Sequence, residues 1–171
     1  MTEQPTLDPN AFRAVMGHFA TGISVVTCRM HGLDHAMTAN SFTSVSLDPP
    51  LVLVCVERDS RFDEAVLEAG TWAVNILGAG SRGRARWFAT SGRPLEGQFA
   101  SVPHTRGEAS GALLLNEAIA TMECRTSEVI RGGDHDILLG NPLTVSVVRK
   151  DVDPLLYWTS GYRTIGPALP M

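Results

Sequence analysis

The chain has 171 residues, of which 44% are hydrophobic and 19% charged, as expected for a single globular domain rather than a disordered chain. Its formal net charge of −4 at pH 7 argues against nucleic acid or an anionic membrane surface as a partner. The longest apolar runs, such as residues 51–56, are too short to span a bilayer and no secretory signal opens the sequence, so we expect a cytoplasmic protein.

The cysteines do not predict a disulfide framework or a metal centre. There are three of them, Cys28, Cys55 and Cys124, at wide spacing and in apolar or β-favouring surroundings. An odd, dispersed set fits neither paired disulfides nor a zinc site. We therefore expect buried, reduced thiols and no bound metal.

The first third of the chain predicts one short helix followed by strands. Residues 1–9 are polar with two prolines and predict a flexible arm, and Asp8-Pro9 is typical of a helix start. The next apolar residues recur at helical spacing and predict a helix ending near residues 17–22. A strand over 23–29 and a turn then lead into residues 37–47, a second strand that we expect to break after Asn40.

The middle of the chain predicts two successive pairs, each a strand followed by a helix. Residues 51–57 are almost wholly apolar, and Ser60 is placed to cap a helix that Gly70 ends. Residues 72–77 predict the next strand, and residues 81–90 predict a helix rich in arginine.

The rest of the chain predicts a long surface loop and then more strands. Residues 91–110 are rich in glycine, proline and small polar side chains, which favours an excursion over the surface. Strands are expected over 118–126, 137–148 and 155–158, with a turn over 160–163. Six or seven strands with two or three short helices indicate a mainly β fold, a closed or nearly closed antiparallel barrel.

One glycine motif imitates a dinucleotide-binding site. Residues 78–83 match G-x-G-x-x-G after a strand and before a helix, which is the context of a Rossmann phosphate loop. That fold requires a second strand after the helix, with an acidic residue at its end about 20 positions on. The chain instead enters the glycine-rich loop at Ser91, so a plain turn into a helix is the better interpretation.

Three stretches contain side chains able to hold a ligand. Residues 37–50 combine short, uncharged polar side chains with apolar ones, which suits a flat polar-edged ligand or equally an edge strand with a wet face. Residues 55–61 end a buried strand at a helix start with Ser60 and Arg61, which suits either a phosphate or an ordinary capped helix. His135 lies on a glycine turn between strands, where a surface histidine is the simpler alternative.

The order of these stretches resembles that of the short-chain flavin reductases, which supply reduced flavin to two-component monooxygenases. The resemblance is carried by residues 37–55, then Ser60, then Gly133-Asp134-His135, with weaker similarity over 12–27 and 154–163. It implies a flavin-binding split β-barrel, antiparallel and Greek-key-like, with a few short flanking helices. It also implies a homodimer and a domain over residues 10–165, leaving 1–9 as an arm and 166–171 as a tail.

The same resemblance implies a set of flavin contacts. Residues expected to touch the isoalloxazine and the ribityl chain, or to lie close to the ring, are Thr38, Ala39, Asn40, Ser41, Val45 and Ser46. Residues expected beside the ribityl chain and the phosphate are Cys55, Glu57, Ser60 and Arg61.

The pyridine nucleotide is expected on the exposed face of the flavin ring. His135 would lie beside the nicotinamide and orient it rather than act as an essential base. Tyr157 and Tyr162 would lie near the dinucleotide, although Trp158-Thr-Ser-Gly161 replaces the family's usual basic, histidine-bearing segment there.

The implied reaction is NAD(P)H-dependent reduction of free flavin by hydride transfer to flavin N5. FAD is favoured slightly over FMN because the glycine-rich loop gives an adenosine room, and NADH is favoured over NADPH. Reduced flavin would diffuse to a separate monooxygenase. Two alternatives stay open from the sequence: a non-catalytic flavin-storage module, and an oxidase similar to pyridoxamine-phosphate oxidase on a related barrel.

Overall fold

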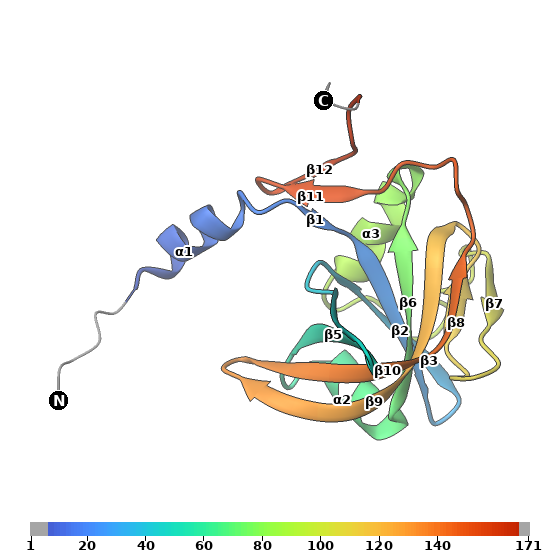
Figure 1. The fold of residues 1–171 in the computed structure, drawn as a ribbon. Helices are drawn as coiled ribbons and strands as arrows, with labels where there is room; N and C mark the ends of the chain where they lie inside the picture. Colours follow the sequence, from blue (N-terminus) through green and yellow to red (C-terminus); the bar gives the residue numbers. More distant parts are fainter. Residues whose placement is uncertain (1–6, 168–171) are drawn as a thin grey trace, which may run out of the picture.

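A curved, seven-stranded antiparallel sheet dominates the computed structural model, which describes residues 7–167 (Figure 1). The strand order in this sheet is β3-β2-β6-β9-β10-β5-β4, so β3 and β4 form its two edges. The strands are β2 (Ser24–Met30), β3 (Leu33–Ala39), β4 (Thr43–Leu47), β5 (Pro50–Glu57), β6 (Thr71–Leu77), β9 (Ala118–Gly132) and β10 (His135–Val147). The structure therefore confirms the mainly β, antiparallel architecture expected from the sequence.

Smaller elements surround this sheet. A second sheet joins the ends of the described chain, with β1 (Thr21–Gly22) paired to β11 (Leu156–Trp158), which pairs with β12 (Gly161–Arg163). The helices are α1 (Pro9–Met16), α2 (Arg61–Ala69) and α3 (Arg82–Ala89), with a short 3₁₀ turn η1 (Ala79–Ser81) before α3. No helix within residues 7–167 is long and apolar enough to cross a membrane.

The helix ends follow the expected chemistry. Asp8 accepts a hydrogen bond from the backbone of Asn10, and Pro9 begins α1. Ser60 caps α2 by accepting from the backbone N–H of Asp63 at 3.1 Å, and Gly70 ends that helix with φ +64°. These contacts confirm both predicted helix starts and the predicted end of α2.

The core consists of two clusters on either side of the main sheet. One cluster surrounds Trp72 between the sheet and α2, and the other packs Phe88 and Phe99 between the sheet and α3. Cys28 and Cys124 are fully buried, and burial raises the pKa of each thiol to about 12. Cys55 is only half-buried, so the expectation that all three thiols are buried holds for two of them.

Ser41 bridges the split in the barrel. Its hydroxyl donates to the backbone carbonyl of Cys55 at 3.2 Å and lies 3.0 Å from the Cys55 backbone N–H, which donates to it. The residue just beyond edge strand β3 is thereby tied to β5 on the far side of the sheet. The predicted break after Asn40 is present, since β3 ends at Ala39 and β4 begins at Thr43.

The glycine-rich segment 91–110 is more ordered than the sequence indicated. It contains β7 (His104–Arg106), which pairs with β8 (Leu113–Leu115), and it buries Gln98, Phe99 and Val102 against the α3 side of the sheet. The expected excursion over the surface is therefore wrong for these residues, because spaced apolar side chains anchor an otherwise polar stretch. The expected turn over 160–163 likewise forms a strand, β12, after a turn at Thr159 and Ser160.

Glu123 on β9 holds the end of this segment in place. This residue is 4% exposed, and its carboxylate accepts from the backbone N–H groups of Ala109 and Ser110, the Ser110 hydroxyl and the Thr144 hydroxyl, at 2.8–3.1 Å. Burial raises the pKa of this carboxyl, but the four hydrogen bonds together outweigh burial and place the pKa below its ordinary 4.5.

Glu123→Gln is therefore expected to destabilise the protein by about 2 kcal/mol at pH 7, because the hydrogen-bond donors around Glu123 lose their negatively charged acceptor. A group whose folded pKa is depressed stabilises the fold above its unfolded pKa, and this contribution is lost as pH falls through the folded pKa. Urea denaturation of wild type and variant at pH 7 and at pH 4 should show the difference shrinking at the lower pH. An equal difference at both pH values would contradict the role of the charge.

Candidate functional site

A cleft of about 540 Å³ runs along the open edge of β3. Its other walls are the start of α2, the end of β5 and the segment that follows α3. The cleft thus lies where two irregular connections, 58–60 and 90–95, meet the outer edge of β3.

Most of the residues expected from the sequence line this cleft. They come from four separate elements and meet only in the fold: Thr38, Ala39, Asn40, Ser41, Cys55, Glu57, Ser60, Arg61 and His135.

Four expected residues lie elsewhere. Val45 and Ser46 are on β4, which extends beyond the cleft, and Val45 is 48% exposed. Tyr157 and Tyr162 pack edge to face on each other, and the Arg82 guanidinium lies 5.9 Å from the Tyr162 ring. None of the four lines the cleft as the described residues form it, and their roles in cofactor binding stay predictions.

The open edge of β3 carries outward backbone groups, and two of its carbonyls are bonded to the segment that follows α3. Alternate residues of an edge strand point their N–H and C=O groups outward, away from the neighbouring strand. The outward carbonyl of Asp34 accepts from the Gln98 side chain at 2.7 Å, and that of Ala36 accepts from the Arg93 guanidinium. The Thr38 hydroxyl donates to the Ala85 carbonyl on α3 at 2.8 Å, so this side chain anchors α3 to the strand.

Residues 88–93 form a wall of the cleft that the sequence did not reveal. Arg93 fastens this wall by donating to the carbonyls of Phe88 and Thr90, to the Gln98 side chain and to Ala36 on β3. An arginine in a glycine-rich stretch carries no pattern that predicts such contacts. Only the spacing of Phe99 and Val102, both buried, hinted that the segment folds back.

The start of α2 is the positively charged end of the cleft. Ser60 and Arg61 stand at the helix N-terminus, where free backbone N–H groups and the helix dipole favour an anion. Arg61 donates to the Arg93 carbonyl at 3.1 Å and keeps its remaining donors.

His35 on β3, another cleft residue that sequence reasoning missed, lies beside this charged end. It is 2% exposed, and neither ring nitrogen has a hydrogen-bond partner within the described chain. Burial, and then the charge of Arg61, lower the pKa of this imidazole, which favours the neutral form. In the sequence, His35 stands between a predicted turn and the strand predicted from residue 37, where nothing indicated a buried imidazole.

His135 reaches the cleft from the opposite side. It begins β10 directly opposite Glu57 on β5, after a tight turn at Gly133, whose φ is +73°. Its Nδ1 lies 2.8 Å from the Asp134 carboxylate, and this hydrogen bond lowers the pKa of Asp134. Pairing with Asp134 fixes the ring and leaves Nε2 for a ligand.

Comparison with known proteins assigns the chain that forms this cleft to a family. Residues 16–166 match the model of the flavin reductase like domain. The chain belongs to the flavin reductase-like family. It is 46% identical over 136 residues to the NADH-dependent FAD reductase of Streptomyces globisporus, covering 78% of this chain and 74% of that protein. It is 35% identical to the NADH:riboflavin 5'-phosphate oxidoreductase of Streptomyces pristinaespiralis, covering 98% and 94% respectively.

Solved flavin reductases share the fold. BorF, the flavin reductase component of a bacterial two-component tryptophan halogenase, superposes with a TM-score of 0.86 at 40% identity, over 94% of this chain and all of BorF. The Streptomyces globisporus NADH:FAD oxidoreductase in complex with NAD and FAD fragments gives a TM-score of 0.87 at 39% identity, over 96% and 98%. The family and fold expected from residues 37–55, 60 and 133–135 are therefore confirmed.

The residues of this flavin reductase cleft fit a flavin. A strand edge with outward amides and short uncharged side chains matches the alternating donors and acceptors on a planar ring system. An arginine at a helix N-terminus, with an unpartnered buried imidazole beside it, matches a phosphate.

Proposed function

We propose that this chain reduces free flavin with NADH and releases the reduced flavin to a separate monooxygenase or halogenase component. The observation that carries the proposal is that one cleft joins the polar edge of β3 to the start of α2 and to His135. The relatives named as NADH-dependent FAD and flavin reductases support the same reaction.

The role of the protein in this reaction is alignment. Bound flavin accepts hydride at its ring from the nicotinamide, so the chain has to hold two rings in contact. In the proposal Thr38, Ala39, Asn40 and Ser41 hold the ring edge, and His135 orients the nicotinamide on the open face. The Ser41 hydroxyl both donates to the backbone carbonyl of Cys55 and accepts from its backbone N–H, and these two hydrogen bonds keep the ring-edge residues rigid.

The polar tail of the flavin is assigned to the other end of the cleft. Cys55 and Glu57 lie at the end of β5 on the way to α2, beside the proposed path of the ribityl chain. Ser60 and Arg61 would hold the phosphate, with the Ser60 hydroxyl donating while it accepts from Asp63.

A flavin-dependent NADH assay tests the proposal. Protein, NADH and FAD or FMN are mixed in air, and loss of the NADH absorbance is followed with and without flavin. We expect turnover that requires both protein and flavin. Flavin binding without NADH loss would instead support a storage module, and amine oxidation without NADH would support the oxidase alternative.

The proposal includes a cytoplasmic location and a domain over residues 10–165. Three free cysteines in the described chain and NADH as the reductant are consistent with a reducing compartment.

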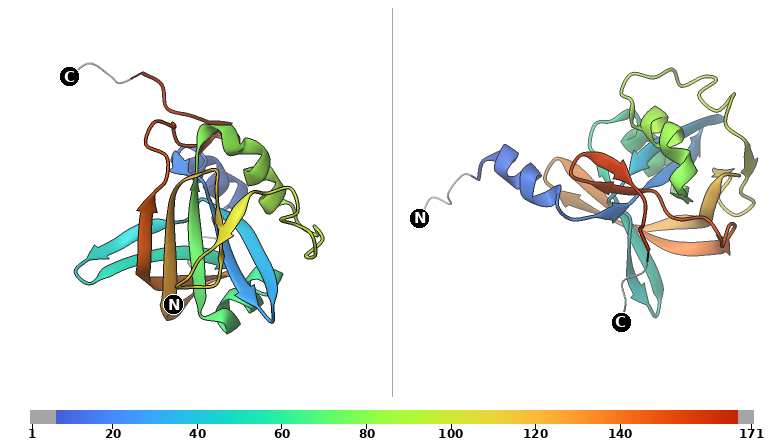
Figure 2. Two further views of the ribbon diagram at one scale, coloured as in Figure 1. Left: turned by 90° about the vertical axis from the view of Figure 1, so that its right-hand side faces the viewer. Right: turned by 90° about the horizontal axis from the view of Figure 1, so that it is seen from above.

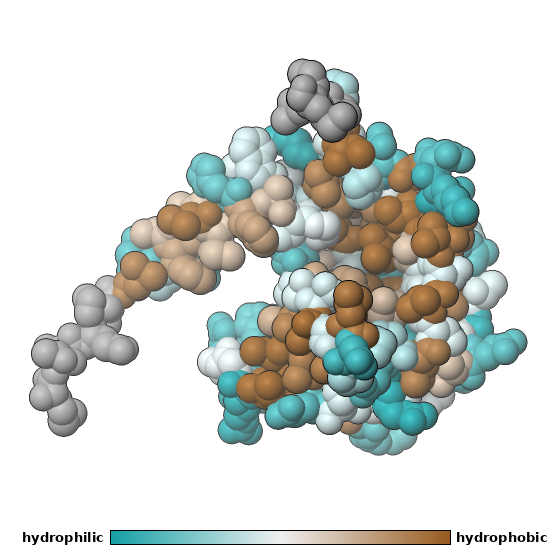
Figure 3. All heavy atoms as spheres, in the orientation of Figure 1, coloured by the Kyte–Doolittle hydropathy of each residue, from teal (hydrophilic) through white to brown (hydrophobic). Residues whose placement is uncertain are grey.

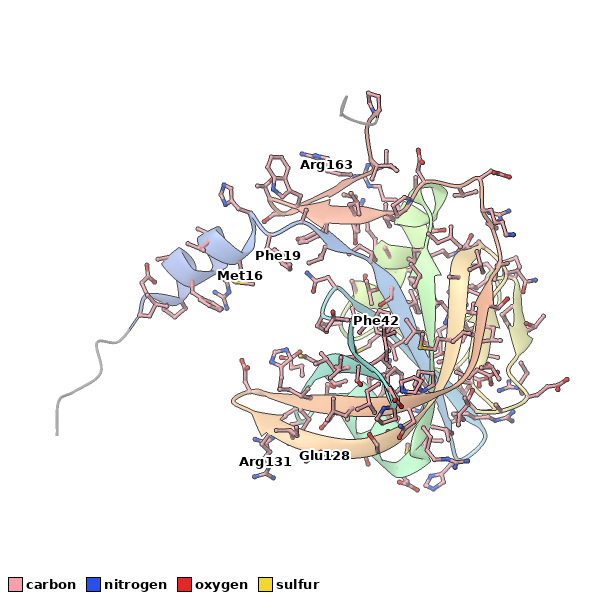
Figure 4. The ribbon with its side chains drawn as sticks, viewed as in Figure 1. Met16, Phe19, Phe42, Glu128, Arg131 and Arg163 are labelled. Carbon is pink, nitrogen blue, oxygen red and sulfur yellow. The ribbon has the colours of Figure 1, made fainter. Side chains whose placement is uncertain are left out.

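A homodimer is also part of the proposal, and α1 supports it. This helix has no buried residue, projects from the barrel, and carries an apolar side that includes Val15, 72% exposed (Figures 1 and 2). Met16 and Phe19 lie on the side of this arm that faces the barrel, where Phe42 lies opposite (Figure 4). The hydropathy surface shows apolar side chains on α1 and on the β9–β10 hairpin around a hollow, which a second copy would fill (Figure 3).

Val15→Asp combined with Phe19→Asp is therefore expected to convert a dimer into monomers, because two charges would be buried in the interface. Light scattering after gel filtration measures the mass directly. Ala14→Asp, on the face of α1 turned away from Phe12 and Met16, is the control and should stay dimeric. A dimeric double variant, or a monomeric wild type, would contradict this interface.

A further inference from the structure

A second hollow, of about 790 Å³, lies beside the flavin cleft. It is formed by the tip of the β2–β3 hairpin, residues 32–34, and by residues 95–104. Leu95 lines both hollows, so the two spaces share a wall. Most of its lining comes from the glycine-rich segment 91–110, where the sequence left room for an adenosine.

The order of groups along β3 relates the two hollows. Thr38, at the proposed ring end, lies three residues after His35, or about 10 Å along the extended strand. His35 lines the same cleft as Ser60 and Arg61, so the phosphate end of the cleft lies beside this point of the strand. Leu33 and Asp34 of the second hollow come immediately before His35, about 3–7 Å further from Thr38 along the strand. The second hollow therefore begins where the proposed flavin phosphate ends.

The walls of the second hollow suit an uncharged, flat group. Leu33 is 41% exposed there, and the rings of Phe99 and His104 meet edge to face with centroids 5.8 Å apart. The Asp34 carboxylate is neutralised by a two-pronged pair with Arg106 at 2.8 and 2.9 Å.

The hollow is poorly suited to a phosphate. Among the described residues that line it there is no lysine or arginine, and Glu96 adds a carboxylate. A base and its ribose match this lining, because planar rings pack on apolar and aromatic side chains.

We propose that the second hollow binds the adenosine half of FAD and makes this chain prefer FAD to FMN. The inference rests on the proposed function, since the flavin ring and first phosphate must occupy the β3 cleft. The diphosphate would cross at Arg61 and His35, and the segment 95–104, held to β3 by Gln98, would cover the adenosine.

Ala100→Trp tests the proposal by filling the hollow from an exposed position on its wall. Dissociation constants for FAD, FMN and riboflavin are measured by flavin fluorescence titration, together with the KM for NADH in the FMN-dependent assay. We expect the variant to weaken FAD binding about tenfold and to leave FMN and riboflavin binding and the NADH KM within about twofold.

A milder, matched pair repeats the test. Leu33→Ala removes a wall of the hollow, whereas Leu67→Ala removes an equally exposed leucine on α2, both side chains being 41% exposed. Only Leu33→Ala should reduce the preference for FAD over FMN.

Three outcomes would overturn the proposal: equal loss of FAD and FMN binding, no change in either, or a raised NADH KM with unchanged FAD binding. The last would assign the hollow to the adenosine of NADH. FMN-dependent NADH oxidation in wild type and variants reports separately on the proposed function, so its loss is distinguishable from a misplaced adenosine.

Discussion

Replacing Arg61 with alanine is expected to weaken FMN and FAD binding by about tenfold to a hundredfold, because a charge-assisted hydrogen bond to phosphate contributes roughly 1.5–3 kcal/mol. Riboflavin, which lacks the phosphate, should bind wild type and variant equally well. Arg61 is the first residue of α2, where the backbone N–H groups of the helix start also favour an anion. Ser60, the N-cap, adds a hydroxyl at the same place. Fluorescence titration of the three flavins at one ionic strength measures the effect.

The comparison needs a control for net charge. Arg29→Ala removes one positive charge from an exposed position on β2, outside the cleft, and should change no flavin affinity more than about twofold. Equal weakening of riboflavin and FMN by Arg61→Ala would mean that Arg61 shapes the cleft rather than holding a phosphate. Unchanged FMN affinity would place the phosphate elsewhere.

His135→Ala is expected to lower kcat/KM for NADH by about tenfold, which corresponds to one hydrogen bond of roughly 1–1.5 kcal/mol lost to the nicotinamide. Flavin affinity should be unchanged, since the expected contact of His135 is with the other ligand. His135 starts β10 opposite Glu57 and is oriented by Asp134 at 2.8 Å. Steady-state kinetics with NADH varied at saturating flavin measures this change.

The orienting role of His135 makes a second, separable prediction. His135→Gln, which keeps a hydrogen-bonding side chain, should recover part of the lost kcat/KM, and its pH profile between pH 6 and 8 should match that of wild type. A general base would behave differently, because glutamine cannot take a proton. An activity of His135→Gln as low as that of His135→Ala, with a changed pH profile, would contradict the orienting role.

The sequence indicated the fold well because its patterns are local. Ser60 and Gly70 bracket α2, and the apolar run 51–56 forms the middle of β5, as capping and periodicity require. The order within segment 91–110 could not be predicted from local patterns. Its buried Gln98 and Phe99 are held by contacts with β3 and α3, which are distant in the chain.

The site residues likewise fall into those marked by a local sequence pattern and those placed only by tertiary contacts. Residues 37–41 and 57–61 lie in continuous stretches whose composition marks them, and the structure brings both stretches into one cleft. His35 and Arg93 escaped notice because each belongs to the site only through tertiary contacts: burial without a hydrogen-bond partner for His35, and four carbonyl or amide partners for Arg93. Tyr157 and Tyr162 were assigned by resemblance alone, and in this chain they pack beside Arg82, outside the cleft.

An anaerobic single-turnover experiment tests the proposed reduction of flavin by NADH most directly. The protein is mixed with equimolar FAD and then with NADH in a stopped-flow instrument, and flavin and nicotinamide absorbance are followed together. We expect flavin to bleach and NADH to disappear in step, one for one, only when protein is present, and more slowly with NADH deuterated at the transferred position. Flavin that stays oxidised while bound, with NADH unchanged, would contradict the proposed reduction.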